Sequence, residues 1–218
     1  MIKNIQTKIY MVLLLLFFLM LNSCIGLSMD IQMRKDGSSK VILEYHISRM
    51  AEVIGRLDGN QKWPIVPIGR ADWERTAQRI PTMKIVSFSS RENSREAVTN
   101  VTLEFDNTEA LLKFLDPSGE RSSLDAGRLQ LILSDPVLPE INDDLVELVQ
   151  QVSAGYKFSI SFTAEGNPSS LTITDNKGKE IPPPTDSEII PSGRKVSLSI
   201  PTAEILNNKN GLGVRFNW

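Results

Sequence analysis

The amino-acid sequence predicts an α+β fold: an antiparallel β-sheet built from hairpins, with several short helices packed on one face. Three observations support this class. Apolar and polar residues alternate with a period of two in many segments, which places each apolar set on one face of a sheet. Between these segments the apolar spacing changes to that of a helix, as at 47–57. The elements alternate as hairpins and single helices, an order typical of a sheet with helices on one face.

The segment 27–47 is the clearest hairpin. Its two strands carry apolar residues at alternate positions, namely Leu27, Met29, Ile31 and Met33, then Val41, Leu43, Tyr45 and Ile47. Between the strands, Lys35 to Ser39 form a turn in which Gly37 can adopt a positive φ. From Ile47 to Leu57 the apolar residues follow helical spacing, so we expect a helix there with Ser48 as its N-cap.

The middle of the chain continues the same alternation of elements. A short helix is expected over 71–80, capped by Asp72 and ended by Pro81. A second hairpin pairs 83–89 with 98–106, and a helix then runs from the Asp106–Glu109 stretch to Leu115.

The C-terminal part is expected to be almost entirely β-structure. After a strand at 129–133 and a helix from Asn142 to Gly155, the remaining strands are expected at 156–162, 171–173, 196–200 and 212–218. The proline-rich stretch 181–185 is a stiff loop and not a domain linker. Residues 24–218 are therefore predicted to form a single domain. The alternative is two subdomains divided near Gly155, with an all-β C-terminal part.

The N-terminus has the layout of a bacterial lipoprotein signal. Lys3 and Lys8 precede an apolar run from Ile9 to Leu21, which is shorter than the roughly 20 residues that span a bilayer. Leu21, Asn22, Ser23 and Cys24 then form a lipobox. We expect residues 1–23 to be removed and Cys24 to become the lipidated N-terminus; the alternative is an uncleaved signal anchor.

The lipid anchor predicts a location in the cell envelope. One acyl chain binds a membrane only marginally, and a lipidated N-terminal cysteine of this class carries three, palmitate among them. In many Gram-negative lipoproteins an aspartate after the cysteine retains the protein in the inner membrane. Ile25 occupies that position here, which favours the outer membrane, at its periplasmic face or surface.

Composition excludes several classes of function. The segment before Cys24 holds two lysines and no acid, so the mature chain would carry 22 basic and 26 acidic residues, a net charge of −4. Nucleic acid is therefore not an expected partner. With Cys24 lipidated and His46 the sole histidine, nucleophile–histidine catalysis and a Cys/His zinc site are excluded. We expect no cofactor, no metal and no catalytic residue.

Two tryptophans beside a proline-rich loop form the most informative cluster. Trp63, Pro64, Pro67 and Trp73 are expected to provide a ligand or partner surface, because aromatic side chains supply large contact areas with a polar edge. The alternative is a loop held to the core by its own tryptophans.

The stretch Gly26–Ser38 (GLSMDIQMRKDGS) resembles the opening of the LppM-like lipoproteins, where a lipidated cysteine leads directly into a strand, an Asp-Gly-Ser turn and a second strand. The DGSS turn at 36–39 and the stretch Leu57–Trp73 (LDGNQKWPIVPIGRADW) resemble conserved lipoproteins of spirochaetes such as treponemes. This resemblance implies an envelope lipoprotein with an α+β domain and, in one mycobacterial branch, an association with lipids. It carries over no catalytic residue.

The sequence therefore predicts a non-enzymatic protein held close to a membrane by its N-terminal lipid. Its domain is expected to bind an apolar or amphipathic ligand, or an envelope partner. The alternatives are a structural or assembly lipoprotein that acts through protein contact alone and, least favoured, a hydrolase with an unrecognised acidic site.

Overall fold

The structure is a computed structural model, and it describes most of the chain that follows Cys24. The residues described are 25–48, 69–94, 96–125, 127–136, 153, 155–167, 169–206 and 208–218. Among the predicted elements, the helix from Ile47 to Leu57 and the helix from Asn142 to Gly155 lie largely outside these residues. Ile47 itself belongs to a strand, where it pairs with Ala97.

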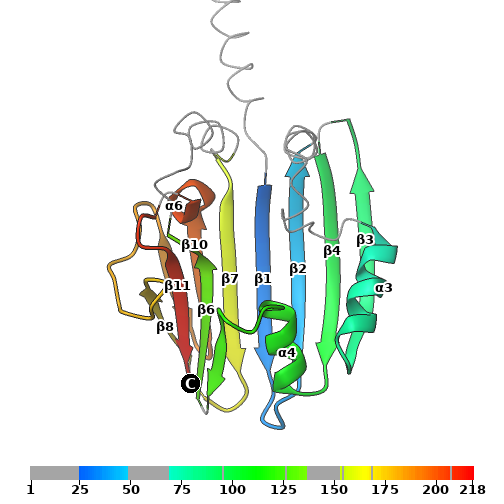
Figure 1. Ribbon diagram of the computed structural model, residues 1–218, viewed down its shortest axis with the longest axis horizontal. Coiled ribbons are helices and arrows are strands. Elements are labelled where there is room, and N and C mark those ends of the chain that lie inside the picture. Colours follow the sequence, from blue (N-terminus) through cyan, green and yellow to red (C-terminus); the bar gives the residue numbers. More distant parts are fainter. Residues whose placement is uncertain are drawn as a thin grey trace, which may run out of the picture.

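A seven-stranded sheet forms the larger layer (Figure 1), in the order β3-β4-β2-β1-β7-β10-β9. Its strands are β1 (Ile25–Met33), β2 (Ser39–Ser48), β3 (Met83–Glu92), β4 (Glu96–Phe105), β7 (Lys157–Ala164), β9 (Glu188–Ser192) and β10 (Lys195–Pro201). All neighbours are antiparallel except β1 and β7, which run parallel with Leu27 opposite Phe158. The first strand after Cys24 is therefore the middle strand of the sheet.

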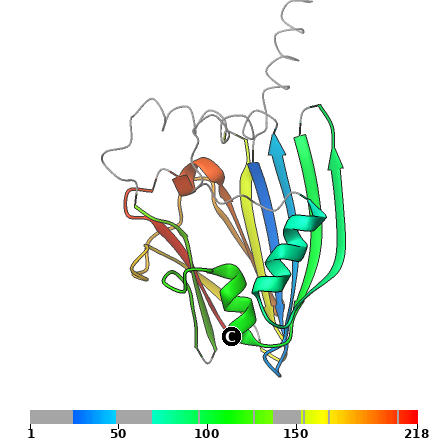
Figure 2. The same cartoon turned by 45° about the vertical axis from the view of Figure 1, so that its right-hand side comes forward.

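A second layer covers one face of this sheet (Figure 2). It contains a four-stranded antiparallel sheet in the order β5-β6-β11-β8, together with three helices. These elements are β5 (Ser123–Asp125), β6 (Arg128–Ser134), β8 (Ser170–Thr174), β11 (Leu212–Asn217), α3 (Arg70–Arg79), α4 (Thr108–Leu115) and α6 (Thr202–Leu206). The small sheet lies beside β7 and β10, while α4 and α3 continue the layer across the strands at the other side.

The core fills the space between the two layers, and period-two alternation selects its residues. On β4, every second residue from Ala97 to Phe105 is buried and the residues between them are half-buried. The fully buried large side chains come from both sheets and from the helices: Trp73, Phe105, Phe162, Phe216, Ile31, Leu103, Leu111, Leu129, Ile160, Leu198, Ile200 and Leu212. Residues before and after Gly155 share this one cluster, because β7 and β10 extend the sheet that contains β1.

The local predictions for the two hairpins and for the helices α3 and α4 agree with the structure in position, whereas the short helix α6 was not predicted. Gly37 has φ 84°, and Arg34 donates its backbone N–H to the Ser38 carbonyl across the first turn. Asn107 caps α4 by accepting from the Ala110 N–H. The predicted cap of α3 was wrong by three residues. Gly69 is its N-cap, and Asp72 lies one turn inside, where its carboxylate accepts from the Gly69 N–H.

The predicted fold class holds in part. The chain combines helices and hairpins, but it is mostly β-structure and its strands form two sheets, not one. The large sheet is not purely antiparallel, because β1 and β7 pair in parallel. These two strands are separated by more than a hundred residues of sequence, so their pairing has no local signal. The short strands β5 and β9 were not predicted. β9 contains Pro191 and has all five residues exposed, so it has no alternating pattern to detect.

Candidate functional site

The residues predicted to carry function lie mostly outside the described part of the chain. This applies to Cys24, to Leu21, Asn22 and Ser23, and to Trp63, Pro64 and Pro67. Trp73 is described, and it lies on α3 with only 2 % of its surface exposed. Its ring packs near Phe114, with 6.2 Å between ring centroids. Trp73 therefore contributes to the core in the described structure, and it offers no exposed surface of its own.

An open cleft of about 650 Å³ lies at the end of the large sheet where β1 begins. We call it the upper cleft, because that end is at the top of Figure 1. It is lined by Gly155, Tyr156, Lys157, Asp186, Ser187, Glu188 and Pro201. These residues come from three separate segments: the start of β7, the loop that leads into β9, and the end of β10.

Strand register places the upper cleft beside the first residues of β1. Because β1 and β7 are parallel, Ile25 and Lys157 begin their strands at the same end of the sheet. Gly26 lies so close to Tyr156 that an added Cβ would be 2.8 Å from its ring. The Tyr156 carbonyl in turn accepts a hydrogen bond from Thr202, the first residue of α6. The cleft wall is thus tied both to the N-terminal strand and to the end of β10.

The upper cleft carries two carboxylates and one ammonium group. Lys157 Nζ lies 3.8 Å from Glu188 Oε1, and both side chains are more than half exposed. Such an exposed pair contributes at most about 1 kcal/mol, so either group can exchange its partner for a ligand. Asp186 makes no ion pair within the part of the chain that the structure describes. The Ser187 hydroxyl oxygen is buried and has no hydrogen-bond partner among these residues.

A smaller groove of about 180 Å³ opens on the outer face of the large sheet, next to the upper cleft. It shares Glu188 with that cleft and is lined by serines and by apolar residues, namely Ser28, Ser159, Ser161, Ser197, Ser199, Met29, Ile160, Ile190 and Leu198. On the same face Asp30 accepts hydrogen bonds from Ser161 (2.6 Å) and Gln32 (2.8 Å) and lies 3.3 Å from Lys195 Nζ. Burial alone would raise the pKa of Asp30, but these contacts hold it below its ordinary value.

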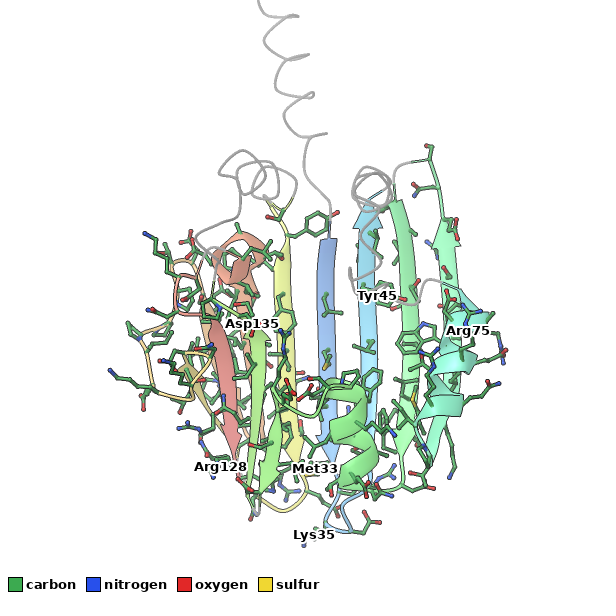
Figure 3. The ribbon with its side chains drawn as sticks, in the orientation of Figure 1. Met33, Lys35, Tyr45, Arg75, Arg128 and Asp135 are labelled. Atoms are coloured by element: carbon green, nitrogen blue, oxygen red, sulfur yellow. The ribbon has the colours of Figure 1, made fainter. Side chains whose placement is uncertain are left out.

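The opposite end of the large sheet has a third opening, of about 360 Å³. Met33 and Lys35, labelled at the bottom of Figure 3, lie on its wall together with Gly37, Leu124 and Trp218. The Trp218 ring packs 4.8 Å from Phe162, and its backbone N–H donates to the Gly127 carbonyl. The last residue therefore joins the small sheet to the core at the end farthest from the start of β1.

The sole histidine and the acidic residues form no metal centre among the residues described. His46 lies on the outer face of β2, with one ring nitrogen 3.4 Å from Glu44 and the other 3.4 Å from Glu96. The turn that begins at Asp175 is a simple hairpin turn, in which that carboxylate accepts from the backbone of Lys177 and Lys179. Within the described ranges, no helix has the length and apolar character needed to cross a membrane.

No protein-family model, curated protein or solved structure matches this chain. The arguments that follow therefore depend on its own residues.

Sequence reasoning missed the upper cleft. Lys157, Asp186 and Ser187 belong to segments that have no shared motif, and only the parallel pairing of β1 with β7 brings them beside Gly26. The one signal present in the sequence was the group of polar residues that follows the prolines at 182–184.

Proposed function

We propose that this chain is a non-enzymatic, lipid-anchored protein of the cell envelope whose domain binds an amphipathic ligand at the membrane surface. The lipobox that ends at Cys24 supports the anchor, and Ile25 after it supports an outer-membrane location, at the periplasmic face or the surface. The resemblance to LppM-like lipoproteins belongs to the same proposal. The observation that carries it is the position of the upper cleft beside the first residues of β1.

The distance between anchor and cleft is short. Gly26 follows Cys24 by two residues, and two residues span at most about 7 Å of extended chain. Each polar headgroup layer of a bilayer is roughly 5–7 Å thick, from the difference between its total and hydrocarbon thickness. A lipid on Cys24 would therefore hold the upper cleft at about the depth of the headgroups, where an amphipathic molecule presents its polar part.

Membrane fractionation tests the anchor. Wild-type protein in its own host should sediment with membranes, and Cys24→Ala should release the protein into the soluble fraction. Continued membrane retention of Cys24→Ala with an uncut signal would contradict the lipoprotein assignment.

Native mass spectrometry of wild-type protein, extracted from that host in a mild detergent, tests ligand binding. We expect a non-covalent lipid to remain bound in addition to the covalent anchor. Repeated spectra that show only the anchored protein would contradict an amphipathic ligand.

A second function, assembly through protein contact without a ligand, is supported by a different feature. β9 is an edge strand of the large sheet, and it exposes Ile190 (55 %) and Ile189 (37 %). Exposed edge strands with apolar residues can pair with another chain, although Pro191 removes one backbone donor from this edge. Cross-linking in the host would support this function if it captured one stoichiometric partner protein and no lipid was found.

A further inference from the structure

We infer that the upper cleft binds the zwitterionic headgroup of a phospholipid, with its ammonium group at Asp186 and Glu188 and its phosphate at Lys157 and Ser187. The inference rests on the proposed function, and it specifies the chemical class of the ligand. It follows from the charges of the cleft, the state of its polar groups and its position near the anchor.

The charges of the cleft favour a ligand that carries both signs. Two carboxylates and one ammonium leave the cleft with a net charge of −1, so a purely anionic ligand would be repelled. A purely cationic ligand would leave Lys157 without a new partner. A phosphate joined to an ammonium group by a short linker satisfies both sides, because it replaces the Lys157–Glu188 contact by two separate ion pairs.

The polar groups of the cleft are available to such a ligand. The Lys157–Glu188 pair is long, at 3.8 Å, and solvent-exposed, so separating it costs little. Asp186 has no competing ion pair among the residues described. Ser187 has a buried hydroxyl oxygen that lacks a hydrogen-bond partner within the described structure, and a change of its χ1 rotamer would be needed to bring that hydroxyl to a phosphate oxygen in the cleft.

The net charge of the chain supports the same ligand class. The mature chain would carry a charge of −4, which disfavours approach to a strongly anionic surface. A zwitterionic headgroup avoids that repulsion.

Titration calorimetry on the full chain, purified in dodecyl maltoside, tests this inference. The lipid probes are dihexanoyl phosphatidylethanolamine and dihexanoyl phosphatidylglycerol, each below its micelle concentration. The free probes are phosphoethanolamine, ethanolamine and inorganic phosphate. We expect the zwitterionic lipid to bind at least tenfold more tightly than phosphatidylglycerol and than any of the free probes.

Three variants locate the binding to the cleft: Lys157→Gln, Asp186→Asn and Glu188→Gln. Each should weaken binding of the zwitterionic lipid about tenfold. The charge-matched controls Lys177→Gln and Glu109→Gln lie outside the cleft and should change the affinity for the zwitterionic lipid less than twofold. Thermal unfolding followed by circular dichroism should show that all five variants remain folded, because each changes an exposed side chain.

Several results would overturn the inference. Equal affinity for the two lipids would mean that the acyl chains, not the headgroup, are recognised. Inorganic phosphate that binds as tightly as the lipid would indicate a simple anion site, and equally tight free phosphoethanolamine would exclude a lipid as the source. No binding, or binding unchanged in the cleft variants, would refute the site itself. These failures leave the anchor untouched, since Cys24→Ala fractionation measures that separately.

Discussion

Asp116 provides the sharpest test of the structure, and the perturbation is Asp116→Asn. This residue ends α4, and its side chain is buried in the loop that leads to β5. One carboxylate oxygen accepts from the Ser118 hydroxyl (2.6 Å) and the Gly119 N–H (3.1 Å). The other accepts from the Arg121 N–H (2.5 Å) and the Ser122 N–H (2.8 Å).

An asparagine cannot replace all four contacts. With its amide oxygen toward the Arg121 and Ser122 N–H groups, the NH₂ group can donate to the Ser118 hydroxyl, but it faces the Gly119 N–H and cannot accept from it. The three hydrogen bonds that remain also lose their charged acceptor. Hydrogen bonds to a charged group contribute roughly 1.5–3 kcal/mol each. The loop lies at the surface, where water can solvate the freed N–H group, so we take the lower end of that range. The expected loss is about 2–3 kcal/mol of unfolding free energy at pH 7.

The pH dependence provides an independent check. Burial by itself would raise the pKa of Asp116, but the hydrogen bonds from Ser118, Arg121, Ser122 and Gly119 outweigh it and hold the pKa below the ordinary value of 3.8. A depressed folded-state pKa gives stability that is fully present well above 3.8 and is lost as the pH falls through the folded-state value. The difference in unfolding free energy between wild type and Asp116→Asn should therefore be constant from pH 7 to about 5. It should become smaller below pH 3.8.

Urea unfolding followed by circular dichroism, repeated across this pH range, measures both effects. Asp106→Asn is the matched control at the other end of α4. It removes only an exposed ion pair with Lys84 and should cost less than about 1 kcal/mol. The assigned role of the carboxylate would be refuted if Asp116→Asn lowered the unfolding free energy by less than about 1 kcal/mol. It would also be refuted if the difference in unfolding free energy from wild type stayed the same between about pH 6 and 3.

Three further predictions test the core, the small sheet and the exposed edge. Phe216→Ala removes a fully buried ring whose centroid lies 5.0 Å from that of Phe162. It should lower the unfolding free energy, measured by urea titration, by about 3–5 kcal/mol, and a loss below about 1 kcal/mol would contradict the packing. Gly213→Ala would place a Cβ 2.7 Å from Thr174 Oγ1, so we expect a loss of about 1–3 kcal/mol, and a melting temperature equal to that of wild type would argue against this close approach. Ile190→Lys should change the unfolding free energy by less than about 0.5 kcal/mol, because the side chain is exposed. If β9 mediates assembly, this variant should also lose the cross-link to the partner protein, and an unchanged cross-link would exclude that role for β9.

Local periodicity explains which parts of the fold could be predicted. The strands β1 and β2, the turn at Gly37 and the alternation on β4 all follow from residues close to one another in the chain. The start of α4 within the Asp106–Glu109 stretch was predicted for the same reason. β9 was not, since its exposed residues include two isoleucines and a proline and have no period.

The candidate site depended on information that is not local. Trp73 was singled out for its chemistry, but its burial is decided by the packing of α3 on the large sheet. The residues of the upper cleft showed no common motif. Lys157 begins a strand, whereas Asp186 and Ser187 follow a proline-rich loop, and nothing in the spacing between them indicates that they meet.

The sequence by itself determined the N-terminal signal, the alternating strands and the exclusion of histidine- and cysteine-based chemistry, because each depends on residue type or on neighbours along the chain. Only the tertiary structure decided that β1 lies in the middle of a seven-stranded sheet and pairs in parallel with β7. Strands with the same alternating pattern satisfy many pairings equally well, and the one adopted depends on the fit of the whole core. That pairing places Lys157, and with it the upper cleft, beside Gly26, two residues after the predicted anchor.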